Sequence, residues 1–420
     1  MGDDPTALRI DGQRLWKRLN DLGEVGAVLG PNGERGCARL ALTNADRLGR
    51  DLVVTWMHDL GLQISIDAIG NVIATRPGSD PSLAPVMTGS HIDTVRTGGR
   101  FDGNLGVLAG LEVLETFEQH GISTERAVQV GFFTNEEGAR FAPDMLGSLV
   151  YVGGLALEEA LDALAMDDGA RLGDELGAIG YAGPTPCPAA SAPHAFVELH
   201  IEQGPVLEEH DITIGVVTGV QGISWTEYTI TGRSAHAGTT PMRLRRDPVV
   251  AAASIVGEAR RLASVMGNSQ VTTVGRMELF PGLINVVAQR VTFTLDLRNT
   301  DERMLQQAEA HMADFISDAC AAEGCTVEQR TLARFEPVSF DPTMIERVER
   351  IADDQGNSTL RMPSGAGHDA QMLARMCPTS MIFVPSVGGL SHNIAEFTAP
   401  HHIEAGANVL LHTLLEVARR

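Results

Sequence analysis

The chain has 420 residues, of which 43% are hydrophobic and 20% are charged, an ordinary balance for a soluble globular protein. A length beyond the roughly 250–300 residues at which one hydrophobic core stops growing predicts two domains. The 54 acidic and 32 basic residues give a net charge of -22, which argues against nucleic acid or an anionic membrane as a partner because phosphates would repel such a surface.

Helical and extended patterns alternate in the first part of the sequence. Residues 45–61 carry apolar side chains at helical spacing, and residues 64–76 alternate like a strand. A short buried-type strand at 86–89, a helix over 106–120 and a strand at 128–133 follow. This order predicts an α/β fold with a parallel or mixed sheet covered by helices on both faces.

The composition changes after residue 215, where strands and helices follow in the order β-α-β-β-α-β with tight turns. The helices are expected from Asp247, a good N-cap before Pro248, and from Asp301. This order predicts a small antiparallel sheet with both helices on one face. We therefore expect a ferredoxin-like α+β domain of residues 216–331, inserted into a main domain that consists of the two segments 1–215 and 332–420.

The five cysteines are an odd number, scattered along the chain, with no Cys-x-x-Cys pair. This usage indicates free thiols in a reducing compartment rather than a disulfide framework. The N-terminal sequence MGDDPTALRI lacks the basic and apolar segments of an export signal, and no apolar run is long enough to span a membrane. We therefore expect a cytoplasmic protein.

Four apolar runs end in side chains of the kind that bind metal ions. They are VMTGSHID (86–93), VQVGFFTNEEGARF (128–141), AFVELHIEQ (195–203) and MIFVPSVGGLSHN (381–393), and Asp102 follows the first of them. In an open α/β sheet, ligands lie at the carboxyl ends of the strands. A single His or Asp after a strand is more often a solvated loop residue, but four compatible runs favour one metal site.

Two of these runs suggest a division of roles. His91 and Asp93 would lie on the same side of an extended segment, so Asp93 could orient His91 or a neighbouring ligand. Of the adjacent acids Glu136 and Glu137, one could bind a cation while the other takes a proton from bound water. A metal lowers the pKa of that water from near 16 to roughly 7, so a carboxylate can act as the base at neutral pH.

The other two positions leave alternatives open. Glu198, His200 and Glu202 would share one face of a strand, and the sequence does not decide which of them binds a metal. Asp102 precedes a helix, where free amides favour an anion; it is either a helix-entry acid or a bridge between two cations. Mixed histidine and carboxylate ligation suits Zn, Mn, Co or Ni.

Several further residues are ordinary when taken singly. They are His236 in GRSAHAGTTP, Asn285 in PGLIN and Arg298 at the end of an alternating strand. The Gly-rich segment SGAGHD (364–369) could wrap an anion with its backbone amides, but it lacks the Lys-Ser/Thr of a phosphate loop. No Gly-x-Ser-x-Gly occurs, which disfavours a serine hydrolase.

With these residues assembled, the sequence resembles the M20 metallopeptidase-like superfamily. Within it, the sequence is similar to the amidase, hydantoinase/carbamoylase branch, which contains N-carbamoyl-L-amino acid hydrolases, β-ureidopropionases and allantoate amidohydrolases. GSHIDTV, Asp102, the Glu-Glu pair and His392 carry the superfamily resemblance. ELHIEQGPVLE, GRSAHAGTTPM, the Asn285-Val286-Val287 turn and PSGAGHDA carry the branch resemblance, which spans nearly the whole chain. The departures touch no implied ligand; they include Asn135, Asn104 and Cys37-Ala38.

The resemblance implies a metallohydrolase with two divalent metal ions per chain. His91, Asp102 and His200 would surround one ion, and Asp102, Glu137 and His392 would surround the other. The main domain would be catalytic, and the inserted domain would form a homodimer and act as a lid.

The resemblance also implies roles outside the ligand set. Glu136 would be the general base, with Asp93 behind the ligands. The implied substrate contacts are Gln203, His236, Asn285, Arg298, Gly365 and Ala366. His236, which would stabilise the oxyanion, and Asn285 would act from the partner subunit.

The resulting prediction is a hydrolase that cleaves a carbon–nitrogen bond in the ureido group of a small carboxylic acid. The candidates are N-carbamoyl-L-amino acids, 3-ureidopropionate and allantoate, attacked by hydroxide generated at the metals, with Arg298 pairing with the substrate carboxylate. The alternatives are an M20-type dipeptidase or aminoacylase on the same fold, and a non-catalytic metal-binding or ligand-sensing protein. HIEQGP, Asn285 and Arg298 argue against the former. Glu136 argues against the latter, because a binding module needs no base.

Overall fold

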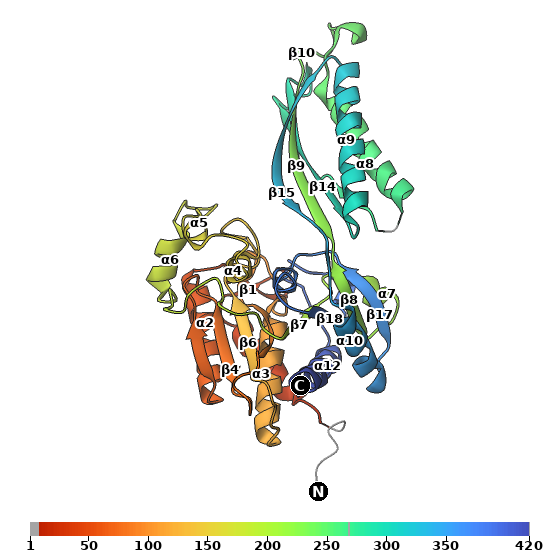
Figure 1. Ribbon diagram of the computed structural model, residues 1–420. Coiled ribbons are helices and arrows are strands. Elements are labelled where there is room, and N and C mark those ends of the chain that lie inside the picture. Colours follow the sequence, from red (N-terminus) through yellow and green to blue (C-terminus); the bar gives the residue numbers. More distant parts are fainter. Residues whose placement is uncertain (1–7, 268, 420) are drawn as a thin grey trace. The chain divides into compact units, whose positions relative to one another are not determined.

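The computed structural model describes residues 8–267 and 269–419, and the chain forms two compact units (Figure 1). We call Met1–Thr218 with Phe340–Arg420 the main unit, and Gly219–Ser339 the inserted unit. The sequence predicts boundaries after residues 215 and 331, and the second boundary lies later in the structure. Strand β15 (Thr326–Phe335) is longer than expected because it continues past a register shift between Thr331 and Ala333.

The main unit is built on a mixed sheet whose central strands are parallel. β5 (Val86–His91), β6 (Val128–Phe133), β7 (Ala195–Ile201) and β18 (Thr379–Val384) lie side by side in the order β18-β7-β5-β6. β18 runs parallel to β7, and β5 runs parallel to β7 and β6. β8 (Ile214–Val220) pairs antiparallel with β18 at one flank. The predicted mixed α/β fold is confirmed.

The prediction of one strand over residues 64–76 is wrong, because this segment forms two strands. β3 (Gln63–Ile66) and β4 (Val72–Arg76) pair antiparallel with each other, and β4 continues the sheet beyond β6. Between them the Asp67 carboxylate accepts hydrogen bonds from two backbone N–H groups, and Gly70 adopts a φ of 86°. This tight turn reverses the chain while the alternation of side chains continues on both sides, so alternation alone does not reveal it.

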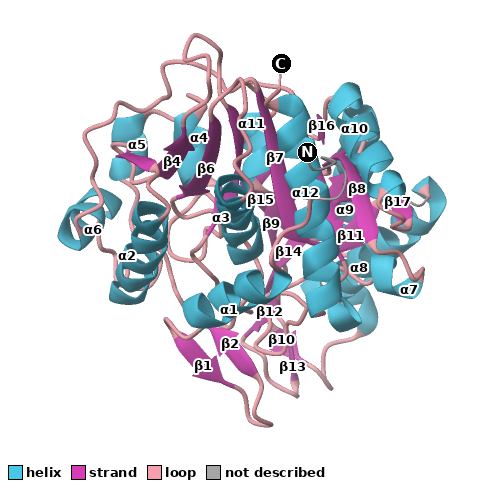
Figure 2. Ribbon diagram, turned by 90° about the horizontal axis from the view of Figure 1, so that it is seen from below, coloured by secondary structure: helices cyan, strands magenta, loops and turns pink. Residues whose placement is uncertain are grey.

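Helix α3 (Asn104–Gln119) occupies the centre of one helical layer. It packs against β5, β6 and β7, and α1 (Gly12–Gly23) and α12 (Pro400–Val417) pack against it in turn (Figure 2). This position explains why α3 is buried along most of its length. The main unit also contains β1 (Ala27–Leu29), β2 (Arg35–Cys37), α2 (Asn44–Asp59), α4 (Leu146–Tyr151), α5 (Leu157–Leu161), α6 (Leu172–Ile179), α7 (Val206–Glu209), α10 (Pro342–Asp354), β17 (Thr359–Ser364), α11 (Asp369–Leu373) and η3 (Val387–Gly389).

The inserted unit is an antiparallel sheet with two helices on one face. β9 (Gly222–Thr231) is flanked by β14 (Arg290–Asn299) and β15, and β11 and β12 both pair with β14. α8 (Pro248–Met266) begins at the capping residue Asp247, as predicted, and packs with α9 (Glu302–Ala322) on the sheet. The smaller elements are β10 (Ala235–His236), η2 (Met242–Leu244), β11 (Val271–Thr273), β12 (Met277–Phe280), β13 (Val286–Val287) and β16 (Val338–Ser339).

The segment WTEYTITGRSAHAG (225–238), whose side chains alternate like those of one strand, is interrupted in the structure. β9 ends at Thr231, and β10 leaves that sheet to pair antiparallel with β13.

The five cysteines are all free thiols, as expected. Among the described helices, none combines the length and the apolar composition needed to cross a bilayer.

Candidate metal centre

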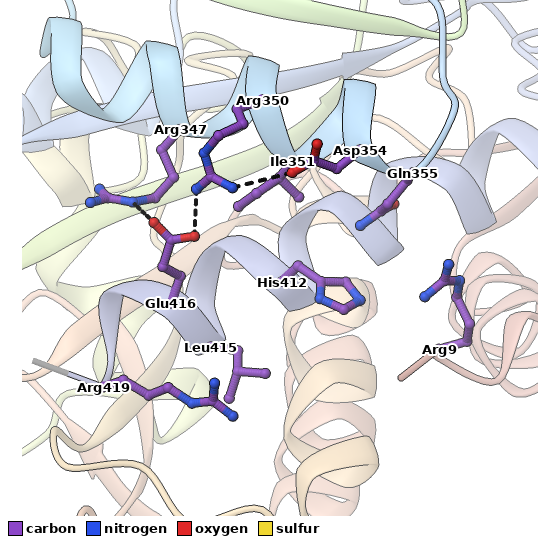
Figure 3. Close-up of a pocket in the computed structure, with 10 residues that line it drawn as sticks. All are labelled: Arg9, Arg347, Arg350, Ile351, Asp354, Gln355, His412, Leu415, Glu416 and Arg419. Atoms are coloured by element: carbon purple, nitrogen blue, oxygen red, sulfur yellow. Dashed lines mark hydrogen bonds and ion pairs between the residues drawn. The ribbon is translucent and has the colours of Figure 1, made fainter. Parts of the chain in front are cut away.

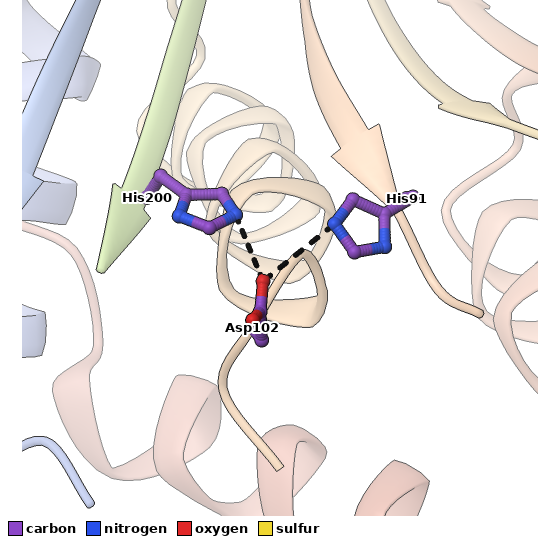
Figure 4. Close-up of side chains that lie close together, drawn as sticks. All are labelled: His91, Asp102 and His200. Atoms are coloured by element: carbon purple, nitrogen blue, oxygen red, sulfur yellow. Dashed lines mark ion pairs between the residues drawn. The ribbon is translucent and has the colours of Figure 1, made fainter. Parts of the chain in front are cut away.

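Three of the expected ligands meet at the carboxyl end of the central strands of the main unit. His91 is the last residue of β5, His200 lies one residue before the end of β7, and Asp102 lies just ahead of α3. Asp102 Oδ1 is 3.2 Å from His200 Nε2 and 3.7 Å from His91 Nε2 (Figure 4). All three side chains are buried. We call this group the first triad.

A second triad uses the other oxygen of Asp102. His392 Nε2 lies 3.6 Å from Asp102 Oδ2 and 3.1 Å from Glu137 Oε2. These three side chains are close enough to share one ion. Because its two oxygens face different histidines, Asp102 has the geometry of a carboxylate that bridges two cations.

The ring nitrogens of the first triad are oriented for metal binding. His91 Nδ1 is 2.9 Å from the carbonyl oxygen of Asp93, and His200 Nδ1 is 2.8 Å from that of Ile201. A carbonyl only accepts, so each Nδ1 carries a proton and each Nε2 faces Asp102. A bare lone pair would repel that carboxylate, so a proton or a metal ion must lie between them. Histidine with carboxylate is a donor set that divalent transition metals favour, and the residues fit such ions.

The electrostatics of these residues favour positive charge at the centre. Burial lowers the pKa of His200, but the hydrogen bond and the charge of Asp102 outweigh it and raise this pKa to about 9. The hydrogen bond to Glu137 raises the pKa of His392 to about 9. Burial alone would raise the pKa of Asp102, yet the three histidines hold it below its usual range. A metal ion would therefore compete with protons for these side chains.

Glu136 lies beside the first triad as a buried acid. Its Oε2 is 3.3 Å from His91 Nε2, and the side chain is 7% exposed. Burial, followed by repulsion from Asp369 and Glu137, raises the pKa of Glu136 well above its usual value. The backbone N–H groups of Glu136 and Glu137 both donate to the Asp93 carboxylate, at 3.3 Å each. Asp93 thus orients the two acids as well as lying next to His91.

Glu198, His200 and Glu202 differ in their hydrogen bonds. Glu198 accepts from the Ser90 hydroxyl at 2.6 Å and from a backbone N–H at 2.8 Å. Glu202 accepts two backbone N–H groups at the start of α7. Glu198 also lies near His200 and His368 in a group that could hold an ion. Both of its oxygens are already engaged, so His200 is the residue of the three that faces Asp102.

Two residues that the sequence analysis did not single out hold Asp102 in place. Glu396 accepts from the backbone N–H groups of Phe101 and Asp102 at 3.0 and 3.1 Å. Ser391 Oγ donates to Asp102 Oδ2 at 2.8 Å, as does Gln203 Nε2. Ser391 and Glu396 flank His392 within GGLSHNIAE, so that segment was the available signal. Only the folded chain shows that they contact Asp102.

The structure does not group all the expected substrate residues together. His236 and Asn285 lie side by side in the inserted unit, where Ala237 N donates to the Asn285 carbonyl at 3.0 Å. His236 Nδ1 accepts from two backbone N–H groups at 3.0 and 3.2 Å, so Nε2 carries the proton. Arg298 is near the far end of β14, roughly 25 Å of strand away, paired with Asp296 at 2.9 Å.

The loop that holds Gly365 and Ala366 belongs to the main unit and lies beside the first triad. His368 stacks edge-on against the His200 ring, with centroids 4.5 Å apart. Ser364 Oγ contacts His368 Nε2 at 2.8 Å and accepts from the Ala366 N–H at 3.1 Å. The Ala366 amide of this Gly-rich loop is therefore engaged within the loop itself.

A separate cavity of about 680 Å³ lies between α10 and α12 and contains none of the candidate ligands (Figure 3). Glu416 binds Arg347 at 2.9 Å and Arg350 at 2.5 Å across it. Both arginines lie in the middle of α10. We interpret this cluster as a structural feature of the two helices.

Residues 87–416 match the family model described as Peptidase family M20/M25/M40. The chain is 43% identical to an N-carbamoyl-L-amino-acid amidohydrolase of Rhizobium meliloti, over 98% of this chain and 97% of that protein. It is 35% identical to the allantoate amidohydrolase of Escherichia coli K12, over 85% and 87%. A crystal structure of an amidase of the hydantoinase/carbamoylase family from Burkholderia multivorans is 45% identical, with a TM-score of 0.93 and 99% coverage of both chains.

The chain therefore belongs to the M20/M25/M40 peptidase family. Within that family its similarity to hydantoinase/carbamoylase amidases extends from end to end, so the resemblance expected from the sequence is confirmed.

Gly103 lies against the His91 ring. It adopts a φ of 64° next to Asp102, and a Cβ at this position would overlap the His91 imidazole. We expect Gly103→Ala to weaken binding of divalent cations roughly 10- to 100-fold, because the ring and its carboxylate neighbour must separate. Equilibrium dialysis with metal analysis measures this change.

Gly121→Ala is the matched control for this prediction. Gly121 has a φ of 61° and open space around it, so alanine there adds backbone strain without a clash. Equal cation binding by the two variants would contradict the assignment of His91 as a ligand.

Proposed function

We propose that this chain is a metal-dependent amidohydrolase that cleaves a carbon–nitrogen bond other than a peptide bond. Its substrate would be a small carboxylic acid with a ureido group, such as an N-carbamoyl-L-amino acid, 3-ureidopropionate or allantoate. The observation that carries the proposal is Asp102, whose two oxygens face separate histidines beside the buried acid Glu136. The end-to-end similarity to proteins named for N-carbamoyl-L-amino acids and allantoate supports this substrate class.

We propose that the centre holds two divalent cations, chosen from Zn, Mn, Co and Ni. The first triad would bind one and the second triad the other, with Asp102 shared. When bound, these ions would polarise the scissile carbonyl and lower the pKa of the attacking water.

The chain's own residues would handle the proton. Glu136 would take it from the attacking water and pass it to the leaving nitrogen, because it is buried next to His91 and has no other ion-pair partner among the described residues. Asp93 would hold both acids in position, because the backbone N–H groups of Glu136 and Glu137 donate to its carboxylate. Gln203 would contact the substrate through Oε1, which is buried and has no hydrogen-bond partner among the described residues.

The two ends of the substrate would be recognised by different groups. Arg298 would bind the carboxylate with two parallel hydrogen bonds; its guanidinium is held by Asp296 and lies over Trp225, 5.6 Å from the ring centroid. His236 would donate from Nε2 to the developing oxyanion, and Asn285 would support it. Gly365 and Ala366 would line the pocket beside His200.

We propose that the chain acts as a homodimer through the inserted unit. His236 and Arg298 lie roughly 25 Å of strand apart, so one small substrate cannot contact both in the same chain. Exposed apolar side chains lie on β12 and the following turn, including Phe280 at 52% and Leu283 at 58% exposure. Such a patch on an edge strand is typical of an interface.

The roles of the two acids can be separated by mutation. We expect Glu136→Gln to lower turnover by about 10²–10⁴ with metal content retained, because the shape persists but the base is lost. Glu137→Gln should instead lose metal from the second triad. Turnover and metal content are measured on the same preparations, and two variants that keep both properties would show that the roles are misassigned.

Product analysis tests the substrate class. Hydrolysis of a ureido acid releases ammonia, whereas a dipeptidase or aminoacylase on the same fold releases an amino acid and no ammonia. We expect ammonia from at least one of N-carbamoyl amino acids, 3-ureidopropionate and allantoate. Arg298→Lys should impair that reaction strongly, because a point charge cannot form the paired hydrogen bonds. Efficient dipeptide hydrolysis without ammonia would overturn the proposal and leave the metal centre intact.

Hybrid dimers test whether His236 acts across subunits. His236→Ala and Glu136→Gln chains should each be inactive alone. After mixing, random subunit exchange should restore about a quarter of the wild-type activity, because half of the dimers would carry one intact site. No recovery, in samples where exchange is demonstrated by mass labelling, would place His236 in its own chain's site or outside any site.

A further inference from the structure

Arg39 is a fully buried arginine in the main unit that forms no ion pair with any carboxylate in the described part of the chain. Its guanidinium donates instead to neutral oxygens. Nε donates to the Ile92 carbonyl at 2.7 Å, and Nη1 donates to the carbonyls of Leu22 and Val25 at 2.9 and 2.8 Å. Nη2 donates to Asn104 Oδ1 at 2.6 Å. Burying a cation without a carboxylate is costly, so packing alone does not explain this residue.

The acceptors of Arg39 belong to three segments that are distant in sequence. Leu22 and Val25 lie at the end of α1. Ile92 lies directly between His91 and Asp93. Asn104 is the first residue of α3, two residues after Asp102. Arg39 therefore connects the segments that carry two members of the first triad, whose places are visible in Figure 4.

The connection between His91 and Asp102 is otherwise a loop with two glycines, Gly98 and Gly99. This loop runs along the segment that contains Arg39: Arg39 N donates to Thr94 Oγ1 at 2.7 Å, and Thr94 N donates to the Arg39 carbonyl at 2.9 Å. Gly98 exchanges two backbone hydrogen bonds with Cys37. The segment of residues 37–39 is thus the support on which the loop lies, and the Arg39 side chain reaches both of its ends.

We propose that Arg39 and Asn104 are positioning residues that set the separation of His91 and Asp102, and so the cation affinity of the first triad. This inference rests on the metal centre of the proposed function. Arginine suits the task because its planar fork fixes the angles between three segments, which the single ammonium group of lysine cannot do. Asn104 extends the connection to the segment before Asp102, because its Nδ2 donates to the Arg100 carbonyl at 3.3 Å.

The two triads should respond differently to a loosened connection. The first triad depends on the distance between β5 and the start of α3. The second triad shares Asp102 but takes its other members from the segments after β6 and β18. A weakened connection should therefore affect one cation position much more than the other, whereas general destabilisation would affect both.

The experiment titrates metal-depleted protein with Co²⁺, followed by visible absorption and by competition with a chelator, to give two dissociation constants per chain. We expect Asn104→Leu and Arg39→Lys each to weaken one constant about tenfold, and the other less than threefold. The double variant should bind Co²⁺ about as weakly as the single variant with the lower affinity, since both changes break the same connection.

Arg14→Lys is the matched control. Arg14 joins α1 to the buried Glu112 of α3 at 2.6 Å but contacts neither ligand segment, so both constants should stay within twofold. Thermal unfolding identifies any variant that fails to fold. If Arg39→Lys does, Asn104→Leu still decides the matter, because it removes only the two hydrogen bonds of the Asn104 side chain, to Arg39 and to the Arg100 carbonyl.

Equal weakening at both positions, or none, in folded Asn104→Leu would overturn this inference. If wild-type protein binds two ions but hydrolyses no ureido acid, only the proposed function fails. Wild-type protein that binds no cation would overturn both.

Discussion

The buried acids around Asp102 are the constraint on which the rest of the main unit depends. Asp93, Asp102 and Glu136 are 2%, 3% and 7% exposed, and their ion-pair partners in the described structure are histidines, with no arginine or lysine among them. Burying such charge without compensation is costly. Neutral donors such as Ser391 and Gln203 orient Asp102 without cancelling its charge. The arrangement is therefore stable only with protons or metal ions among these side chains.

The sheet explains why the sequence revealed the centre. His91, Glu136, His200 and His392 all follow or end parallel strands, and parallel neighbours bring their carboxyl ends to one edge. These four residues can therefore be predicted from the positions of the strand ends in the sequence. Strand ends do not indicate Glu396, because its role depends on the amides of Phe101 and Asp102, almost 300 residues earlier in the chain. Hydrogen bonds that join such distant segments leave no periodic signal in the sequence.

The sequence also did not predict the hydrogen-bond partners of residues that have the chemistry of metal ligands. Glu198 and Glu202 alternate with His200 as ligands would, and only the structure shows that Glu198 accepts from Ser90 and that Glu202 accepts from the amides of α7. In the fold, the turn at Asp67 was missed because alternation continues across it. The helix that starts at Asp247 was found because the capping side chain and the following proline act locally. Local chemistry was predictable, and tertiary partners were not.

The inserted unit carries two of the proposed substrate contacts in different sheets, His236 on β10 and Arg298 on β14. His236 pairs with Val286, before β14 begins, whereas Arg298 lies roughly 25 Å along β14 from its first residue. In the proposed homodimer, twofold symmetry would allow His236 of one copy and Arg298 of the other to contact one substrate. The exposed apolar side chains of β12 and its turn give such a pair a driving force.

Arg39 shows how a cation can lie close to this centre without neutralising it. Its positive charge is compensated by carbonyl oxygens and by Asn104, so the carboxylates of Asp93 and Asp102 remain available to metal ions. A carboxylate partner in place of those carbonyls would add another buried negative charge beside the ligands. Cys37 and Asn104, two of the sequence departures, both contact this guanidinium. Because these two departures meet at one side chain, we interpret them as parts of a single support for the loop that joins His91 to Asp102.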